Sequence, residues 1–380
     1  MSPWPEDSRS PGGRPVVVHL LQGLQIGGME RTAVDWLTAL DPDQWDRRVI
    51  VYDHPGPLST ALDREEIPWG FFPRKPGVDW GYPFRLGRVL RQWDVDVLHT
   101  HNDTALFYGA LAVRTARTSV MVATLHNVWD ASPKLKWILR RLSHGIGPVV
   151  AVCEELRDRI ESEGWASVGT VRVIKNGVDP GRIAVRRERS EVRAAEETPE
   201  DAPVVGYVGR MDPNKNLGLL LEAFALVRET LPEAHLWLVG EGPDRNALER
   251  QAADAGLDGA VHFCGLQASP GDYYGAFDVF AMSSLSEGMP MVILEALVHG
   301  LPVAAPAVGG VPEMLGDSGR CVAPGDAGAL AGAVTGLLKD PAGAQAMAQA
   351  GRERVLSDFT LEAAASAYES VYREFLDRRR

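Results

Sequence analysis

The segment EGMPMVILE, residues 287–295, carries the clearest chemical signal in the sequence. A proline suits the first turn of a helix and a glycine its end, so the proline of this segment and Gly300 predict a helix over 290–299. Glu287 then lies in the loop before the helix, and Glu295 lies one to two turns inside it. Carboxylates beside the free N–H groups of a helix start can accept hydrogen bonds from sugar hydroxyls, while the N–H groups donate to a phosphate.

Glu295 is surrounded by apolar residues in the predicted helix, and this allows two interpretations. An unpaired carboxylate in such surroundings is costly, so Glu295 must have a partner. The partner is either a hydroxyl group of a ligand or a donor within the protein core. We expect the ligand.

A second polar cluster follows the predicted strand at 203–208, where the sequence continues GRMDPNK. The chain has only six lysines against thirty-three arginines. Lys215, five residues after Arg210, is therefore not expected in this turn by chance. An arginine and a lysine can converge on one diphosphate, the first as a flat fork and the second as a point charge. The alternative is a solvated turn with two surface cations.

Glycine pairs stand between a strand and a helix at several further points. Gly27 and Gly28 precede the helical pattern of 29–40, GEGP occupies 240–243, and GGVPE occupies 309–313. Without side chains, such glycines let an anion reach backbone N–H groups at a helix start. A tight strand-to-helix turn explains the same residues equally well. The G-x-G-x-x-G spacing of dinucleotide-binding proteins is missing.

Histidines end two predicted strands of the first half, in HTHN at 99–102 and in TLHN at 124–127. Polar residues at strand carboxyl ends face the ligand side of a parallel sheet, so we expect His99, His101 and Asn102 on the acceptor side. A zinc site requires a further ligand at suitable spacing, and we identify no third strand end that supplies one. We therefore predict no metal.

The elements that position these residues are short apolar runs alternating with helical patterns, as in parallel α/β sheets. The predicted strands cover residues 16–21, 47–52, 95–100, 119–125 and 148–152, and then 203–208, 235–239, 260–264, 278–282 and 301–305. Residues 181–202 lose the pattern and are rich in both charges, which predicts a solvated linker. The result is an α/β protein of two facing Rossmann-like parallel-sheet domains with a cleft between them. We predict a disordered tail over 1–15, a first domain from 16 to 180 and a second from 203 to 360.

Composition is that of an ordinary globular protein of 380 residues. A net charge of −12 disfavours nucleic-acid binding, three scattered cysteines favour a reducing, cytoplasmic location, and no apolar segment has the character of a signal peptide or membrane span. The stretch KLKWILRR at 134–141 is basic and amphipathic. It is either a solvated helix face or a weak peripheral contact with anionic lipid at the inner face of the membrane.

From about Val16 to Phe375 the sequence resembles the retaining glycosyltransferases of family 4, also described as group 1, which have the GT-B fold. The motifs that carry the resemblance are GGME (27–30), TLHN (124–127), VIKNGVD (173–179), GRMDPNK (209–215), GEGP (240–243), the two glutamates of 287–295, GGVPE (309–313) and PGD (324–326). Ser283 and Ser284 depart from the family, which often has Pro-Ser before the glutamate loop. The family's last helix usually packs on the first domain, so 361–380 is assigned there.

The resemblance implies a nucleotide-sugar donor, most often a UDP-sugar, held mainly by the second domain. Arg210 and Lys215 would bind the diphosphate, Glu287 a hydroxyl of the donor sugar, Glu295 the ribose, and His126 the sugar near the bond being broken. The further residues implied in donor binding are Gly27, Gly28, Gly209, Gly242, Cys264, Leu266, Gly288, Met289, Pro290, Met291 and Val292.

The predicted function is metal-independent transfer of a hexose to an acceptor hydroxyl with retention of configuration. No cofactor is expected, and the acceptor is a lipid, a polysaccharide or a small aglycone. Two alternatives stay open: a nucleotide-sugar 2-epimerase or hydrolase of the same fold, and a protein that binds sugar nucleotides without turnover. An epimerase requires acid and base carboxylates in the first domain, where Asp103 alone flanks the 99–102 motif.

Overall fold

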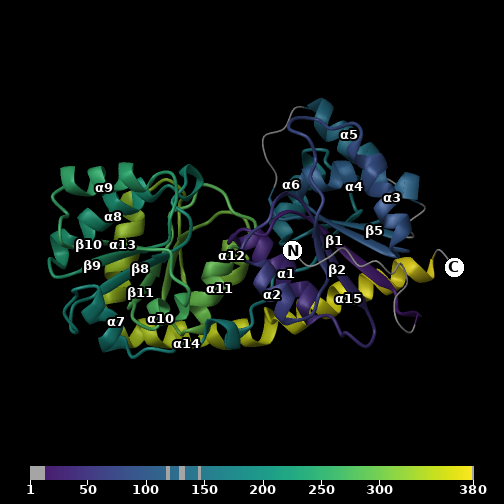
Figure 1. The fold of residues 1–380 in the computed structure, drawn as a ribbon. Coiled ribbons are helices and arrows are strands. Elements are labelled where there is room, and N and C mark those ends of the chain that lie inside the picture. Colours follow the sequence, from purple (N-terminus) through teal and green to yellow (C-terminus); the bar gives the residue numbers. More distant parts are fainter. Residues whose placement is uncertain (1–12, 117–119, 128–132, 144–146, 379–380) are drawn as a thin grey trace. The chain divides into compact units, whose positions relative to one another are not determined.

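The computed structural model describes residues 13–116, 120–127, 133–143 and 147–378. The chain divides into two compact units, one of residues 1–177 with 361–380 and one of residues 178–360 (Figure 1). Each unit is built on its own parallel sheet. The tail predicted over 1–15 falls largely outside the described residues.

Unit 1 contains a seven-stranded parallel sheet in the order β3-β2-β1-β4-β5-β6-β7. Its strands are β1 (Val16–Gly23), β2 (Asp46–His54), β3 (Trp69–Phe71), β4 (Val97–His101), β5 (Val120–Leu125), β6 (Val149–Ala151) and β7 (Val171–Val173). Its helices are α1 (Gly28–Ala39), α2 (Ser59–Arg64), α3 (Tyr82–Gln92), α4 (Asn102–Ala116), α5 (Pro133–Ser143), α6 (Glu154–Ser162) and α15 (Leu361–Asp377).

Unit 2 contains a six-stranded parallel sheet in the order β10-β9-β8-β11-β12-β13. Its strands are β8 (Val204–Val208), β9 (His235–Val239), β10 (Val261–Gly265), β11 (Val279–Ala281), β12 (Val303–Pro306) and β13 (Arg320–Val322). Its helices are α7 (Arg189–Ala195), α8 (Leu217–Thr230), α9 (Arg245–Asp254), α10 (Pro270–Tyr274), α11 (Met291–Val298), α12 (Val311–Leu315), α13 (Ala327–Lys339) and α14 (Pro341–Asp358), with 3₁₀ turns η2 (Pro180–Ile183) and η3 (Pro213–Lys215).

Both sheets have the strand order of a Rossmann fold, which confirms the predicted class. In each sheet the order reverses beside the first strand of the unit, between β1 and β4 and between β8 and β11. Ligands of open α/β sheets bind at the carboxyl ends of the strands that flank such a reversal. The glycine loops after β1 and β8 and the polar residues after β4 and β11 lie at these two points.

The last helix, α15, belongs to unit 1 although it follows the whole of unit 2 in sequence. Its Tyr368 and Tyr372 are fully buried. The indole N–H of Trp45 donates to Glu369 at 2.7 Å, and Arg172 of β7 pairs with Glu374 at 2.6 Å. A buried aromatic face flanked by polar contacts therefore holds this helix on the unit.

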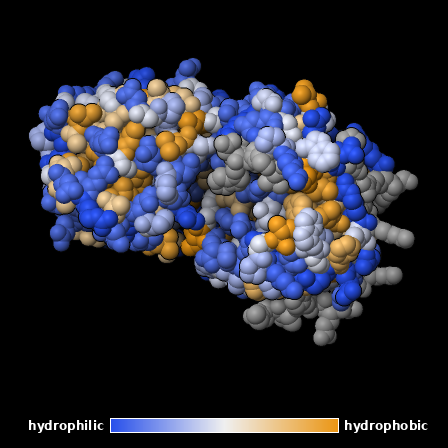
Figure 2. All heavy atoms as spheres, turned by 90° about the horizontal axis from the view of Figure 1, so that it is seen from above, coloured by the Kyte–Doolittle hydropathy of each residue, from blue (hydrophilic) through white to orange (hydrophobic). Residues whose placement is uncertain are grey.

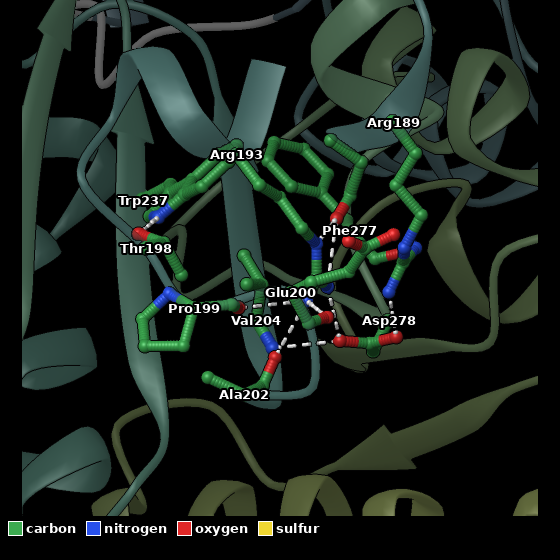
Figure 3. Close-up of polar contacts among 11 residues, drawn as sticks. Arg189, Arg193, Thr198, Pro199, Glu200, Ala202, Val204, Trp237, Phe277 and Asp278 are labelled. Atoms are coloured by element: carbon green, nitrogen blue, oxygen red, sulfur yellow. Dashed lines mark hydrogen bonds and ion pairs between the residues drawn. The ribbon is translucent and has the colours of Figure 1, made fainter. Parts of the chain in front are cut away.

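Residues 181–202 do not form the solvated linker that their charges predict, because they fold as part of unit 2. Arg193 on α7 is 1% exposed, and Figure 3 shows its guanidinium among backbone carbonyls and Asp278. It donates to the carbonyls of Ala276 and Ala202, at 3.0 and 2.8 Å, and pairs with Asp278 at 2.7 Å. Arg193, whose charge predicts exposure to solvent, is instead the centre of a buried hydrogen-bond network.

Among the residues that the structure describes, no helix combines the length and the apolar character needed to cross a membrane.

Candidate active site

In unit 2 the loop after β8 packs directly on the loop after β9. The N–H of Gly209 donates to the carbonyl of Val239 at 2.9 Å, and the N–H of Met211 donates to that of Glu241 at 3.0 Å. A Cβ atom on Gly240 or Gly242 would collide with the backbone of residue 209 or 211. Close backbone approach therefore accounts for these glycines, as the tight-turn interpretation expects.

The loop after β8 is also fastened to the loop after β11. The side-chain amide of Asn214 donates to the carbonyl of Ser286 at 2.8 Å. The hydroxyl of Ser283 contacts the carbonyls of Lys215 and Asn216, at 2.9 and 3.0 Å. Ser283, which departs from the family pattern, thus braces the turn that carries the lysine.

This bracing brings together two of the three predicted catalytic residues of unit 2. Lys215 Nζ lies 2.6 Å from Glu287 Oε1, and both side chains are largely buried. The backbone of residues 287–288 packs against Gly309, which adopts a left-handed φ of 53° and whose Cβ would collide with the Glu287 carbonyl. Each member of such a partly buried ion pair can exchange its partner in the protein for a ligand group of opposite charge.

Arg210 is the accessible cation of the same loop. Its side chain is 65% exposed, and its Nε lies 3.5 Å from Asp212. The hydroxyl of Tyr207 donates to the Arg210 carbonyl at 3.0 Å, which fixes the backbone while the side chain extends into solvent. Arg210 is thus free to fold onto an anion at a small cost.

Helix α11 begins one residue later than predicted, with Pro290 as the residue before it. Its first N–H groups belong to Met291 and Val292, as expected from the motif. Glu295 accepts a hydrogen bond from the Tyr274 hydroxyl at 2.8 Å. Burial and the nearby Glu295 carboxylate raise the pKa of Tyr274, so this hydroxyl remains a donor. Glu295 thus has a hydrogen-bond donor within the protein, and a carboxylate can accept from more than one donor.

The other predicted donor residues of unit 2 surround these groups. Gly288, Met289 and Pro290 are buried under the start of α11. Leu266 is exposed on the loop after β10, whereas Cys264 is half-buried and faces Glu196, with burial raising the pKa of its thiol well above the usual range. The thiol therefore stays protonated.

In unit 1, Asn102 connects the predicted glycine loop to the predicted catalytic histidine. Asn102 has a left-handed φ of 67°, and its side-chain oxygen accepts from the backbone N–H of His126 at 3.2 Å. Its amide nitrogen lies 2.7 Å from the sulfur of Met29, in the first turn of α1. Gly27 precedes α1 and Gly28 begins it, so one asparagine positions both the helix start and His126.

His99 and His101 do not lie on an open acceptor surface, which corrects the prediction from their strand ends. They are 0% and 1% exposed, and their rings point into the layer between the sheet and helices α1 and α15. His99 Nδ1 lies 2.7 Å from the Tyr372 hydroxyl and Nε2 lies 2.8 Å from the Thr124 hydroxyl. Both ring nitrogens are thus occupied within the core.

The sequence interpretation also missed His19, a third buried histidine of this layer. His19 stands on β1 directly opposite His99 on β4, and its ring nitrogen lies 3.3 Å from His101. Ligand atoms of His19, His99 and His101 all lie within 4.8 Å of one another, so β1 adds a third histidine to the two of β4. The signal was a lone polar residue in the apolar run of residues 16–21.

Comparison with known proteins gives two family matches that together span most of both units. Residues 26–182 match the family described as Glycosyltransferase Family 4, and residues 202–340 match Glycosyl transferases group 1. The predicted site residues all fall within these two ranges.

Three similar proteins illustrate the range of the likeness. A lipopolysaccharide core biosynthesis glycosyltransferase, LpsE, of Rhizobium meliloti is 34% identical over 232 residues, 60% of this chain and 65% of that protein. A GDP-mannose-dependent phosphatidylinositol monomannoside mannosyltransferase of Mycolicibacterium smegmatis is 30% identical over 72% of this chain and 75% of its own length. The fold matches that of Anabaena HepE, solved with UDP and glucose, with a TM-score of 0.85 at 22% identity over 95% of this chain and 100% of that one.

Proposed function

The chain belongs to the family 4 glycosyltransferases of the GT-B fold, and from this premise we propose that it transfers a hexose from a nucleoside diphosphate sugar to an acceptor hydroxyl with retention of configuration. The observation that carries the proposal is the Lys215–Glu287 pair at 2.6 Å beside the first N–H groups of α11. We favour a UDP-sugar as donor. The complexes of HepE with UDP and with UDP-glucose are consistent with that choice.

The proposed chemistry is departure of the nucleoside diphosphate, which leaves negative charge on the bridging oxygen. Lys215, Arg210 and the start of α11 stabilise that charge where it develops, as an oxyanion hole does. Glu287 holds a hydroxyl of the donor sugar, and Glu295 accepts from the ribose. These groups supply the positive charge themselves, so the proposal requires no metal.

In this proposal the acceptor hydroxyl attacks the sugar on the same face from which the diphosphate departs, and the anomeric configuration is therefore retained. The departing phosphate takes the proton of the acceptor hydroxyl as the new glycosidic bond forms. His126 contacts the sugar next to the bond being broken. Burial lowers the pKa of His126 to about 3, so the ring is neutral at physiological pH and acts through hydrogen bonds rather than charge.

The binding half of the proposal is tested by thermal unfolding with UDP, GDP and ADP. A nucleotide at a hundred times its dissociation constant stabilises the folded protein by about 2.7 kcal/mol. We expect UDP to raise the melting temperature most, and the rise to shrink in Lys215→Ala but not in Lys339→Ala, whose lysine is exposed on α13. Absence of a shift with all three nucleotides would contradict a nucleotide-sugar donor.

Product analysis separates transfer from the two alternatives. An epimerase releases free 2-epimer when incubated with donor alone, whereas the proposed transferase forms its main product only with an acceptor. A sugar-nucleotide sensor binds the donor tightly and turns over nothing in a broad acceptor screen. Glycosyltransfer is favoured because both carboxylates and both cations of the motifs are present. Lys215 pairs with Glu287, and the side chain of Arg210 is exposed.

We further propose that unit 1 makes a peripheral contact with anionic lipid on the cytoplasmic face of a membrane. Trp137 on α5 is exposed beside Lys134 and Arg141, whereas Lys136 is bound to Glu163 at 2.7 Å and is not available to a membrane. Helix α5 packs on α4, as does α3, and Trp80 and Phe84 at the start of α3 are 69% and 67% exposed. Figure 2 shows hydrophobic residues at the surface of this unit among hydrophilic ones.

Flotation with vesicles tests this contact. We expect wild-type protein to float with vesicles containing anionic lipid and less so in high salt, because exposed charges are screened. Replacing both Trp80 and Phe84 by alanine should abolish flotation, whereas Val168→Ala, at a still more exposed residue elsewhere on unit 1, should not. If wild-type protein stays with the unbound fraction at low salt, the contact does not exist.

A further inference from the structure

The half-buried His126 is joined to the core of unit 1 by a continuous row of hydrogen-bonding groups. Its Nε2 lies 3.1 Å from His101 Nδ1, and His101 Nε2 lies 3.3 Å from His19 Nδ1. His19 Nε2 lies 3.4 Å from the hydroxyl of Tyr372. Each ring thus meets the next through its opposite nitrogen.

The row continues from Tyr372 along the same face of the sheet and returns to α15. Its hydroxyl lies 2.7 Å from His99 Nδ1, and His99 Nε2 lies 2.8 Å from the Thr124 hydroxyl, which lies 3.0 Å from that of Tyr368. The members beyond His126 are 0% to 1% exposed. We call the seven residues His126, His101, His19, Tyr372, His99, Thr124 and Tyr368 the histidine chain.

Two features keep the rings of the chain neutral and in place. Burial lowers the pKa of His19 to about 3 and lowers those of His99 and His101 as well. The indole of Trp36 stacks on His126 with ring centroids 5.5 Å apart and on His99 with centroids 6.4 Å apart. A neutral imidazole carries one hydrogen, so it donates from one nitrogen and accepts at the other.

Within the chain these constraints leave two consistent arrangements of hydrogens, and His19 has one further partner outside it, the backbone carbonyl of Ala33. If His126 donates from Nε2, then His101 accepts at Nδ1 and must itself donate from Nε2, and the same holds for His19. The Tyr372 hydroxyl then accepts from His19 and donates to His99. The reverse arrangement places every imidazole hydrogen on Nδ1. Mixed arrangements set two lone pairs or two hydrogens against each other, or leave a buried hydroxyl unpaired, and both are unfavourable in a buried site.

We propose that His101, His19, Tyr372 and His99 are positioning residues that hold His126 in a single tautomer. Nδ1 is the nitrogen of His126 that does not contact the histidine chain. The tautomer held by the chain determines whether this nitrogen accepts from or donates to a sugar hydroxyl. The proposal rests on the role given to His126 above. The buried groups carry no charge to the site, and they act only by fixing which nitrogen bears the hydrogen.

A competing interpretation is that His19, His99 and His101 bind a divalent metal, since their nitrogens approach one another. Each of the three rings already has a partner within 3.4 Å at both nitrogens, so a metal would have to displace that network. The hydrogen-bonded arrangement satisfies these groups without an ion. Metal binding by these three histidines would therefore overturn the proposal.

The test is nitrogen NMR of protein labelled with ¹⁵N at its nine histidines, in which the two neutral tautomers give distinct ring signals. The signals of the four chain histidines are assigned by single His→Gln variants. We expect all four to bear the hydrogen on the same nitrogen, either all Nε2 or all Nδ1. Opposite tautomers for His126 and His101, or signals that change on adding Zn²⁺ or EDTA, would overturn the proposal whether or not the protein transfers sugar.

Tyr372→Phe cuts the chain by removing one hydroxyl. We expect mixed tautomers in the chain histidines and a fall in kcat of at least about tenfold with little change in the donor KM, well short of the roughly 10⁴-fold loss on misplacing a triad tautomer. Tyr82→Phe is the matched control, because its buried hydroxyl in unit 1 has no partner among the described residues. Tyr368→Phe, at the end of the chain, should change kcat less. If kcat follows lost thermal stability in all three variants instead, the chain is merely structural.

Discussion

Replacing Lys215 by alanine should lower kcat by about 10²- to 10³-fold, which corresponds to roughly 3 kcal/mol of transition-state stabilisation. The lysine is largely buried, and the charge that it faces grows as the diphosphate departs. Its removal also leaves the Glu287 carboxylate, now 2.6 Å from the lysine nitrogen, without that counter-charge next to the phosphates. Initial rates at saturating donor measure the effect.

The control for this variant is Lys339→Ala, which removes an exposed lysine at the end of α13 in the same unit. Thermal unfolding of both variants separates lost catalysis from lost folding, because Lys215 also fastens the loop after β8 to the loop after β11. An unchanged kcat in correctly folded Lys215→Ala would remove the lysine from the mechanism. Lys215→Arg keeps the charge but not its point geometry, so it should recover only part of the rate.

The sequence predicts the inner strands well because burial on both faces leaves continuous apolar runs such as residues 16–21 and 235–239. Three strands escaped prediction, namely β3, β7 and β13, each of three residues and each at the edge of its sheet. At an edge, three residues are too few to give a recognisable apolar run, whereas the longer edge strand β10 was predicted. The sequences WGF, VRV and RCV show why no pattern was visible.

Partners that lie far apart in the sequence explain what else could not be predicted. His19 appears as one polar residue in an apolar strand, and only the register of β1 on β4 sets it opposite His99. Its other neighbour, Tyr372, comes from the end of the chain, 353 residues away. By contrast, the loops after β8 and β11 follow adjacent strands, so the meeting of Lys215 with Glu287 was accessible to a topological argument.

The largest effect on stability is expected on replacing Arg193 by methionine, which keeps the apolar stem and removes the guanidinium. The buried carbonyls of Ala276 and Ala202 and the partly buried carbonyl of Glu200 then lose this donor, and Asp278 loses one of two arginines. An unsatisfied buried polar group costs about 1–3 kcal/mol, and breaking a buried ion pair on one side costs about 3–5 kcal/mol. We expect unit 2 to lose about 4 kcal/mol, measured by urea unfolding.

Arg189→Ala tests whether this loss arises from burial rather than from the ion pair alone. Arg189 binds the same carboxylate, at 2.6 Å from the other oxygen of Asp278, but its side chain is 40% exposed. An exposed pair contributes about 0–1 kcal/mol, so Arg189→Ala should be nearly neutral. Equal losses in the two variants would mean that Asp278 is the essential partner and that the carbonyl contacts of Arg193 add little. A large loss of stability in Arg193→Met alone would establish that α7 is an integral part of unit 2. One buried arginine then fastens this helix, although the charged sequence around it predicts a solvated segment.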